Sequence, residues 1–318
     1  MRVFYELDGQ TKVYTVSPTG VRSKTRYTSF VDTIQLFTRS ATRQDILLLA
    51  ERHFSYFSFV CHVETTEPFT RQDEQRFVQD KLSYITAYHH QSSWCVQYEI
   101  SHVTVDGRPE RHVLWHTWAI SFSLNIALLD SSVDYLLRGF RQRMGSGKLH
   151  IYPRSFFTRL YLMQYIQREN YFLLVLGDAW TQLFQIERGW YKQIEYINWG
   201  VKHLKKLYRE HGLEQQFYRS HDGSYFAGAT VGEIHRLFLR HLLQWVKQYV
   251  PSQTDMVAMG RLMQHRGCID ALSESYTREF GGFLLPFHHA ARMRSLPGYA
   301  WRPDELHVAC CCAFRLRR

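Results

Sequence analysis

The sequence lacks the long apolar runs, the cysteine spacing and the complete catalytic motifs that would assign a function directly. No stretch of about 18 uncharged apolar residues occurs, which argues against an ordinary transmembrane helix. The chain has only 18 glycines and 8 prolines in 318 residues, which excludes collagen-like and low-complexity proteins. Its six cysteines are isolated (Cys61, Cys95, Cys268) or adjacent (Cys310–Cys312), unlike a secreted disulfide framework. The expected location is therefore a reducing cytoplasm.

The composition is that of a globular protein with a large core. Hydrophobic residues make up 45% of the chain, charged residues 21% and aromatic residues 15%. This length allows one large domain or two to three small ones. The formal net charge of +10 is compatible with nucleic acid, an anionic membrane face or an acidic partner, and it does not choose among them.

The first 130 residues are expected to form strands with two helices. Asp8-Gly9 and Asp106-Gly107 are hairpin-turn signals. From Trp118 to Leu128, large apolar side chains alternate with small or polar ones, which predicts a strand with one buried face. Helices are predicted over Ala41–Arg52 and from Thr70, where Asp73 completes a cap.

After residue 130 the pattern alternates between helix and strand, as in α/β proteins. Helices are predicted from Ser131 to Met144, from Ser155, from Gly200 to Tyr208, and over Ile269–Phe280; strands are predicted over Leu149–Tyr152, Phe172–Leu176, a pair turning at Arg188-Gly189, Met256–Met259 and Phe283–Pro286. Leu213–Gly228 is expected to be a linker or long loop. A further long helix carries one apolar stripe: Ile234, Leu237, Phe238, Leu242, Trp245 and Tyr249.

Two motif-like segments do not carry chemistry. Gly145-Ser146-Gly147-Lys148 lacks the first glycine and the final Ser/Thr of a phosphate-binding P-loop, and it directly follows a helix pattern, which favours a helix end. His112 and His116 lie in a segment with strand character, where four residues span about 13 Å, so they do not share a metal ion. The sequence predicts no catalytic residues and no metal ligands.

Three segments carry a resemblance to a known family: Phe57–Leu82, with Glu67-Pro68-Phe69-Thr70 leading into a helix; Val96–Leu128, with its turn at Asp106-Gly107; and Leu173–Gly200, with Gly177, Thr181 and a returning hairpin at Gly189. Together they resemble the actin-like ATPase superfamily, in the branch of the bacterial FtsA and PilM proteins with their candidate-phyla relatives. The resemblance implies a ribonuclease H-like, two-domain α/β architecture with a strand-rich inserted subdomain, in degenerate form. The implied division is a partial first domain at 1–56, the insertion at 57–130, an α/β domain at 131–290 and a basic tail at 291–318.

The resemblance also implies nucleotide-binding residues: Gly177, Asp178, Thr181, Gly200 and Gly260. Their role would be to bring backbone N–H groups against phosphates, with ATP or ADP and Mg²⁺ as the implied ligands. The acids of the family's second phosphate hairpin fall at Val175 and Gln182 in this sequence. For the segment Leu176–Thr181, an ordinary hairpin and a degenerate phosphate loop stay equally open. The first hairpin, Glu6–Lys12, has compressed spacing, which a plain type I′ turn also explains.

The leading hypothesis is a degenerate actin-like scaffold in cell division or type IV pilus-like assembly, leaning away from enzymatic activity. The implied partners are proteins at the inner membrane face, with self-association. Two alternatives are a basic nucleic-acid-binding protein, suggested by the aromatic and basic residues of Arg154–Arg168, and an active ATPase using Asp8 and Asp178. In the helix of that basic segment, Arg159 is expected on the solvated side.

The carboxyl end carries an additional, open expectation. From His288 to Arg318 the chain has six arginines against Asp304 and Glu305, with Cys310–Cys312 among them. The resemblance implies peripheral membrane contact through this end, of the kind that anionic lipid would strengthen. A frayed basic terminus explains the same residues.

Overall fold

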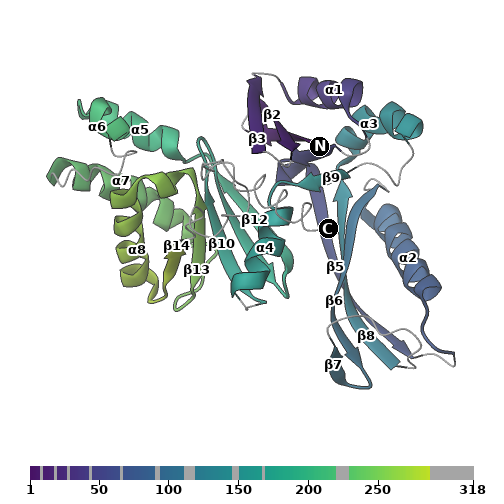
Figure 1. The fold of residues 1–318 in the computed structure, drawn as a ribbon. Helices are drawn as coiled ribbons and strands as arrows, with labels where there is room; N and C mark the ends of the chain where they lie inside the picture. The colour runs from purple at the N-terminus through teal and green to yellow at the C-terminus, as the bar shows by residue number, and fades with distance from the viewer. Residues whose placement is uncertain are drawn as a thin grey trace. The chain divides into compact units, whose positions relative to one another are not determined.

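The fold is seen in a computed structural model that describes residues 1–286, except 8–9, 18–19, 27–28, 43–44, 65–66, 90–93, 111–118, 145–149, 167–168 and 220–228. The chain divides into two compact units, which we call unit 1 (Met1–Phe156) and unit 2 (Phe157–Arg318) (Figure 1). The expected tail at 291–318, the turn Asp8-Gly9 and the pair His112 and His116 lie outside the described residues.

Unit 1 is built on a five-stranded mixed sheet with strand order β3-β2-β1-β4-β9. The strands are β1 (Arg2–Leu7), β2 (Gln10–Ser17), β3 (Gly20–Arg26), β4 (Ile46–Leu49) and β9 (His150–Pro153). The first three strands run antiparallel to one another, while β4 pairs parallel with both β1 and β9. All four residues of β4 are buried, which is usual for a central parallel strand.

Two helices pack against this sheet and share a hydrophobic core with it. They are α1 (Phe30–Ser40) and α3 (Ser131–Met144). Helix α1 begins with a capping box, in which Asp32 N–H donates to Ser29 Oγ over 3.1 Å and Ser29 N–H donates back to the Asp32 carboxylate over 3.2 Å. Helix α3 begins after Asp130, whose carboxylate accepts from Ser132 N–H over 2.8 Å. The core contains residues from both layers: Phe4, Leu47, Ile151, Phe37, Val133 and Leu137.

A second sheet of unit 1 lies in the chain between β4 and β9, after the 3₁₀ turn η1 (Glu51–His53). Its strand order is β5-β8-β6-β7, and helix α2 packs on it. The bounds are β5 (Phe54–Glu64), α2 (Arg71–His89), β6 (Cys95–Val105), β7 (Arg108–Glu110) and β8 (Ala119–Leu129). We call these elements the inserted sheet. The predicted strand is confirmed in β8, whose even-numbered residues from Ile120 to Leu128 face the core with α2. The expectation of a single buried face is wrong, because Ser123, Asn125 and Ala127 on the other face are buried as well.

The sheet of unit 2 has the same strand order and strand directions as the first sheet of unit 1. Its strand order is β12-β11-β10-β13-β14, with β10 antiparallel to β11, β11 antiparallel to β12, and β13 parallel to both β10 and β14. The bounds are β10 (Tyr171–Leu176), β11 (Thr181–Glu187), β12 (Trp190–Ile197), β13 (Met256–Gly260) and β14 (Leu284–Pro286). The same order and directions in both units are those of the ribonuclease H-like fold, so the expected actin-like α/β architecture is confirmed. The domain boundaries expected from the sequence stay a prediction.

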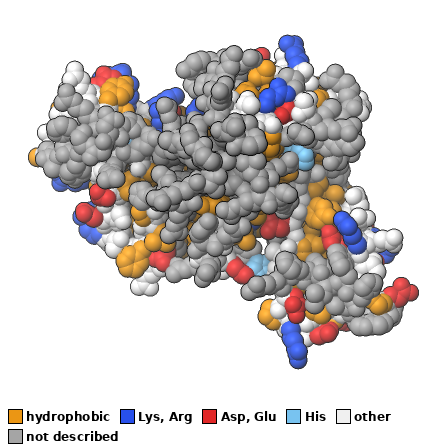
Figure 2. Space-filling view, in the orientation of Figure 1, with side chains coloured by type: hydrophobic (Ala, Val, Ile, Leu, Met, Phe, Trp, Pro, Cys, Tyr) orange, Lys and Arg blue, Asp and Glu red, His pale blue; other side chains and the backbone are white. Residues whose placement is uncertain are grey.

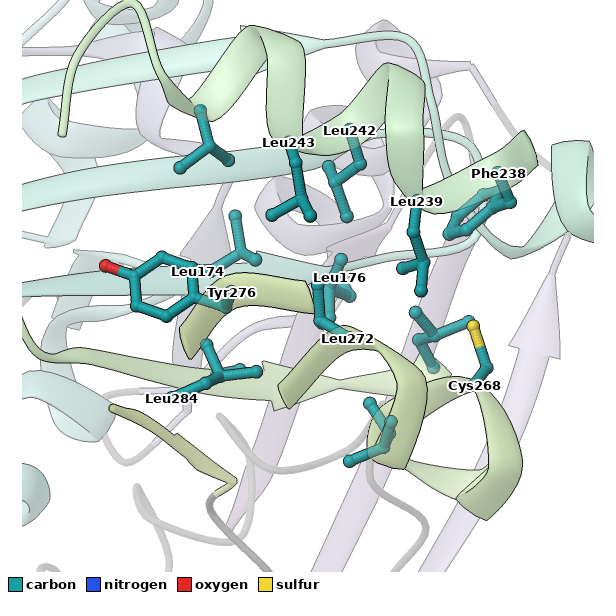
Figure 3. Close-up of a cluster of buried hydrophobic side chains, with 14 of the residues drawn as sticks. Leu174, Leu176, Phe238, Leu239, Leu242, Leu243, Cys268, Leu272, Tyr276 and Leu284 are labelled. Carbon is teal, nitrogen blue, oxygen red and sulfur yellow. The ribbon is translucent and has the colours of Figure 1, made fainter. Parts of the chain in front are cut away.

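The helices of unit 2 are α4 (Phe156–Ile166), α5 (Val201–Glu210), α6 (Glu214–Arg219), α7 (Ala229–Val246) and α8 (Arg266–Phe280), with the 3₁₀ turn η4 (Arg261–Gln264). Figure 3 shows side chains of α7 and α8 packed on those of β10, and the labelled residues form one buried cluster: Leu174, Leu176, Phe238, Leu239, Leu242, Leu243, Cys268, Leu272, Tyr276 and Leu284. Burial of several large apolar side chains, each worth about 1.5–3 kcal/mol, holds this layer on the sheet.

Three local expectations are wrong. Ala41–Arg52 is not a helix: it contains the buried strand β4 and the turn η1, because a short apolar run suits a buried strand as well as a helix. Leu213–Gly228 is not wholly a loop, since α6 lies in it. Leu237 is 39% exposed and lies off the apolar stripe of α7.

Arg159 is also misplaced by the sequence pattern, because its side chain is fully buried instead of solvated. Its guanidinium lies 4.7 Å from the ring centre of Trp190 and donates to the carbonyl of Gly189. The ring and the carbonyl give the buried cation favourable contacts. Arg154, just before the start of α4, is 8% exposed. In the part of the chain that is described, no helix is long and apolar enough to cross a membrane.

Candidate functional site

The five residues implied by the resemblance gather at one edge of the unit 2 sheet. Strands β10 and β13 run parallel and end side by side, with Leu176 paired to Gly260. Gly177 follows β10, and Thr181 begins β11. In α/β folds, ligands bind at this carboxyl edge of the parallel strands. We call this region the unit 2 edge.

The turn between β10 and β11 is closed by its own backbone. Gly177 N–H donates to the carbonyl of Trp180 over 3.0 Å. A Cβ atom at Gly177 would lie only 2.5 Å from that carbonyl oxygen, so a larger residue would displace the turn. Trp180 is 42% exposed at the turn.

Helix α5 begins directly against this turn. The N–H groups of Val201 and Lys202 donate to the carbonyls of Gly177 and Asp178 over 3.1 and 2.8 Å. Gly200 allows the approach, because a Cβ there would lie 2.5 Å from the Asp178 carbonyl oxygen. The N–H groups of Val201 and Lys202 therefore donate to the turn after β10, so they are not available to bind a phosphate at the start of α5.

Thr181 and Gly260 complete the packing of the edge. Thr181 is fully buried, and its hydroxyl donates to the carbonyl of Trp199 over 2.5 Å, which links β11 to the segment before α5. Gly260 has a φ of 110°, and a Cβ there would lie 2.5 Å from the carbonyl oxygen of Leu176. The φ value and the short distance at Gly260 show that the backbones of β10 and β13 approach closely there, which only glycine permits.

One ion pair joins the two turns of the unit 2 edge. Arg261, directly after β13, donates through its guanidinium to the carboxylate of Asp178, which follows the end of β10. The Asp178 side chain is 22% exposed and that of Arg261 is 36% exposed. The sequence patterns do not indicate Arg261; the one local signal is that it directly follows Gly260, the residue after the predicted strand.

Unit 1 also has an acid–arginine pair at the carboxyl edge of its own sheet. Glu6, in β1, accepts from Ala50 N–H over 2.8 Å and from the Arg52 guanidinium over 2.5 Å. His53 Nε2 lies 3.2 Å from the same carboxylate. Burial alone would raise the pKa of Glu6, but these contacts from His53, Ala50 and Arg52 together lower it.

A second buried acid of unit 1 is held in the same way. Glu51 accepts from Ser155 N–H over 2.7 Å, and its carboxylate lies 3.4 Å from the Arg154 guanidinium. Arg154 also donates to the backbone carbonyl of Glu6 over 3.4 Å. The acids Glu6 and Glu51 therefore stabilise the ends of β1 and β4, and sequence patterns did not indicate this network.

The described acids at the carboxyl edges of the two sheets do not fit the Mg²⁺ that the actin-like fold implies with a nucleotide. Mg²⁺ prefers carboxylate oxygens and keeps several waters, but Glu6, Glu51 and Asp178 each already hold an arginine. Among the described residues, no group of three or more His, Cys, Asp or Glu side chains could hold a metal ion. Contact of Gly177, Asp178, Thr181, Gly200 and Gly260 with a nucleotide stays a prediction.

Comparisons with known proteins give similarities of structure only. No protein-family model and no curated protein matches the chain. The chain is similar to a PilM-PilN type IV pilus biogenesis complex, with 13% identity, 98% of this chain and 97% of that chain covered, and a TM-score of 0.46. It is also similar to a Bacteroides thetaiotaomicron protein with an actin-like ATPase fold and unknown function, with 9% identity, 90% of each chain and a TM-score of 0.39.

A third similarity is to MreB5 of Spiroplasma citri bound to AMPPNP, with 10% identity and a TM-score of 0.40. It covers 59% of this chain and 66% of that chain. The fold of this chain rests on the strand order and directions of its two repeated sheets.

Proposed function

We propose that this chain is an actin-like scaffold protein that binds protein partners and does not turn over ATP. The observation that carries the proposal is the state of its acids. The two units contain sheets of the same strand order, as in an actin-like protein. However, Asp178 of the unit 2 edge and Glu6 of unit 1 are each paired with an arginine. An acid in such a pair is not free to hold Mg²⁺ or to orient an attacking water.

The cellular setting that we propose is cell division or type IV pilus-like assembly, with partners at the inner membrane face. Nucleotide contact at the unit 2 edge belongs to the same proposal. It would depend on Gly177, Asp178, Thr181, Gly200 and Gly260, which shape the edge through their close packing, and it would involve no metal ion.

The two alternative functions are less well supported. The nucleic-acid hypothesis rested on the interleaved basic segment, but Arg154 and Arg159 are buried. Where side chains of described residues are visible in Figure 2, Lys and Arg lie among Asp and Glu. The active-ATPase hypothesis uses Asp8 and Asp178; Arg261 holds Asp178, and Asp8 lies outside the described residues.

Phosphate release from ATP with Mg²⁺ tests the proposal. The intact chain should release no more phosphate than buffer does. Steady, saturable release that disappears on Asp178→Ala would show that the chain is an ATPase, and the proposal would then be wrong. Arg278→Ala, an exposed arginine of α8, serves as the matched surface control.

A further inference from the structure

A cavity of about 430 Å³ lies in unit 2, at the end of the sheet opposite the unit 2 edge. It is lined by residues 170–172, where β10 begins, by 185–187, where β11 ends, and by 253–255, which lead into β13. Because β10 and β13 run parallel, the cavity lies at their amino ends, whereas the unit 2 edge lies at their carboxyl ends. Its volume is in the range of pockets that hold small molecules. We call it the amino-edge cavity.

The strands supply the buried, apolar part of this cavity. Tyr171, Phe172 and Ile186 line it and are all buried. Phe172 of β10 is paired with Gln185 of β11, so their side chains lie next to each other on the same face of the sheet. A ligand in the cavity therefore meets an aromatic ring beside a planar amide.

The polar side chains around the amino-edge cavity leave hydrogen-bonding groups unused. In the described part of the chain, the side chains of Gln185, Gln253 and Thr254 have no hydrogen-bond partner. Asn170 accepts from Arg188 N–H over 2.8 Å through Oδ1, so the two hydrogens of its amide are left as donors. A carboxamide offers two donors and an acceptor, and a hydroxyl offers both functions on one oxygen. The cavity thus presents donors and acceptors together.

The charges of the cavity favour a neutral ligand. The lining residues that the structure describes include no Lys, Arg or His, so an anion meets no cation among them. The two acids of the lining already have partners, because Glu187 is paired with Lys192 and Asp255 accepts from Phe283 N–H over 2.9 Å. A cationic ligand would have to share both carboxylates with these donors.

From these features we propose that the amino-edge cavity binds a neutral, polyhydroxylated ligand of the size of a monosaccharide or disaccharide. Each sugar hydroxyl donates and accepts, so neighbouring hydroxyls complement the unused amides of Gln185 and Gln253 and the hydroxyl of Thr254. The C–H face of the sugar ring contacts the apolar side chains of the strands. This site is separate from the nucleotide contact proposed for the unit 2 edge, so either can fail without the other.

Ligand-observed NMR of the intact chain tests the proposal with glucose, galactose, mannose, N-acetylglucosamine, maltose and chitobiose as probes. At least one of them should bind with a Kd of about 1 mM or lower. Charged forms of the same ring, glucosamine and glucuronate, should bind more weakly than the best neutral sugar. The methyl glycoside of that sugar separates two sources of the ligand: it should bind as well as the free sugar if a glycan chain fits the site, and less well if only a free saccharide fits.

Two variants locate the binding. Gln185→Ala removes one amide and Gln253→Asn withdraws the other, and each should raise the Kd about tenfold. Gln253 has a φ of 60°, which Asn also adopts, so the second variant keeps the backbone of the loop.

Gln244→Ala, at an exposed position of α7, is the matched control and should bind the sugar as the intact chain does. Thermal melting shows that the variants are folded. Absence of binding by every probe, tighter binding of glucosamine or glucuronate than of any neutral sugar, or a Kd unchanged in both Gln185→Ala and Gln253→Asn overturns the proposal.

Discussion

Arg261 holds the carboxylate of Asp178 across the end of the unit 2 sheet, from the turn after β13 to the turn after β10. Arg52 holds Glu6 at the carboxyl edge of the unit 1 sheet, from the turn after β4 to the next-to-last residue of β1. Each pair joins the ends of two adjacent parallel strands. The arginine supplies positive charge at a carboxyl edge where a nucleotide-hydrolysing protein of this fold would bind a metal ion.

The Asp178–Arg261 pair should contribute measurably to stability. A double-mutant cycle with Asp178→Asn and Arg261→Gln is expected to give a coupling of about 1 kcal/mol, because both side chains are partly shielded from water. Urea unfolding of the four proteins measures it. The exposed pair Lys206–Glu210, at 3.7 Å on α5, serves as the control and should couple by about 0.3–0.5 kcal/mol. Equal couplings would show that the pair does not differ from an ordinary surface pair.

Glu6 should make unit 1 sensitive to acid. Its pKa is lowered in the folded chain, so its contribution to stability is fully present above its unfolded value of 4.5 and is lost as pH falls through the lower folded value. Glu6→Gln should therefore flatten the dependence of the unfolding free energy on pH below 4.5. Glu233→Gln, at an exposed position of α7, should leave that slope unchanged. An unaltered slope in Glu6→Gln would contradict the role of Glu6.

His235 should destabilise unit 2 as pH falls. It is 7% exposed, its Nε2 lies 2.8 Å from the Tyr208 hydroxyl, and burial lowers its pKa to about 4. The folded chain therefore favours the neutral form of His235. Above the ordinary pKa of 6.5, this residue does not reduce the free energy of unfolding. Between pH 6.5 and about 4, each fall of one pH unit should lower the free energy of unfolding by about 1.4 kcal/mol.

Melting curves at several pH values check this expectation. His235→Gln should reduce the loss over that range, whereas His211→Gln, at an exposed site, should not. If both variants keep the full slope of the unaltered chain, another group is responsible.

Three glycine substitutions separate close packing from helix propensity. Gly200→Ala and Gly260→Ala should each cost about 2 kcal/mol or more, because the new methyl group meets backbone oxygens at 2.5 Å. At Gly260 the φ of 110° adds strain. Gly232→Ala in α7 meets nothing within 4 Å and should stabilise by up to about 1 kcal/mol. Chemical unfolding of the three variants gives the comparison, and a harmless Gly200→Ala would contradict the described fit of α5 on its turn.

Much of the fold could be predicted because its elements carry local signals. The cap at Thr70 and Asp73 marks the start of α2, and the alternation from Ile120 onward marks β8. The sequence wrongly predicts a helix over Ala41–Arg52, since Ile46–Leu49 is too short and too uniformly apolar to show a helical or strand period.

The site was only partly predictable, because the contacts that define it join residues that are far apart in the sequence. The glycines of the unit 2 edge could be proposed from the order of strands and turns. Arg261 and Asp178 are 83 residues apart, and no local pattern links them. The helical pattern predicts Arg159 on the solvated side because charged residues are usually exposed, whereas its guanidinium lies over the rings of Trp190 and Tyr191.

Whether the arginine-held acids leave room for a metal ion is decided by the melting temperature of the intact chain with ATP, once with Mg²⁺ and once with a chelator at the same ionic strength. A ligand that binds the folded state raises the melting temperature, so a metal-dependent complex would reveal itself as a difference between the two solutions. Since Glu6 and Asp178 are held by arginines, we predict the same melting temperature in both. A rise that occurs only with Mg²⁺ would contradict the proposed metal-free state of these acids.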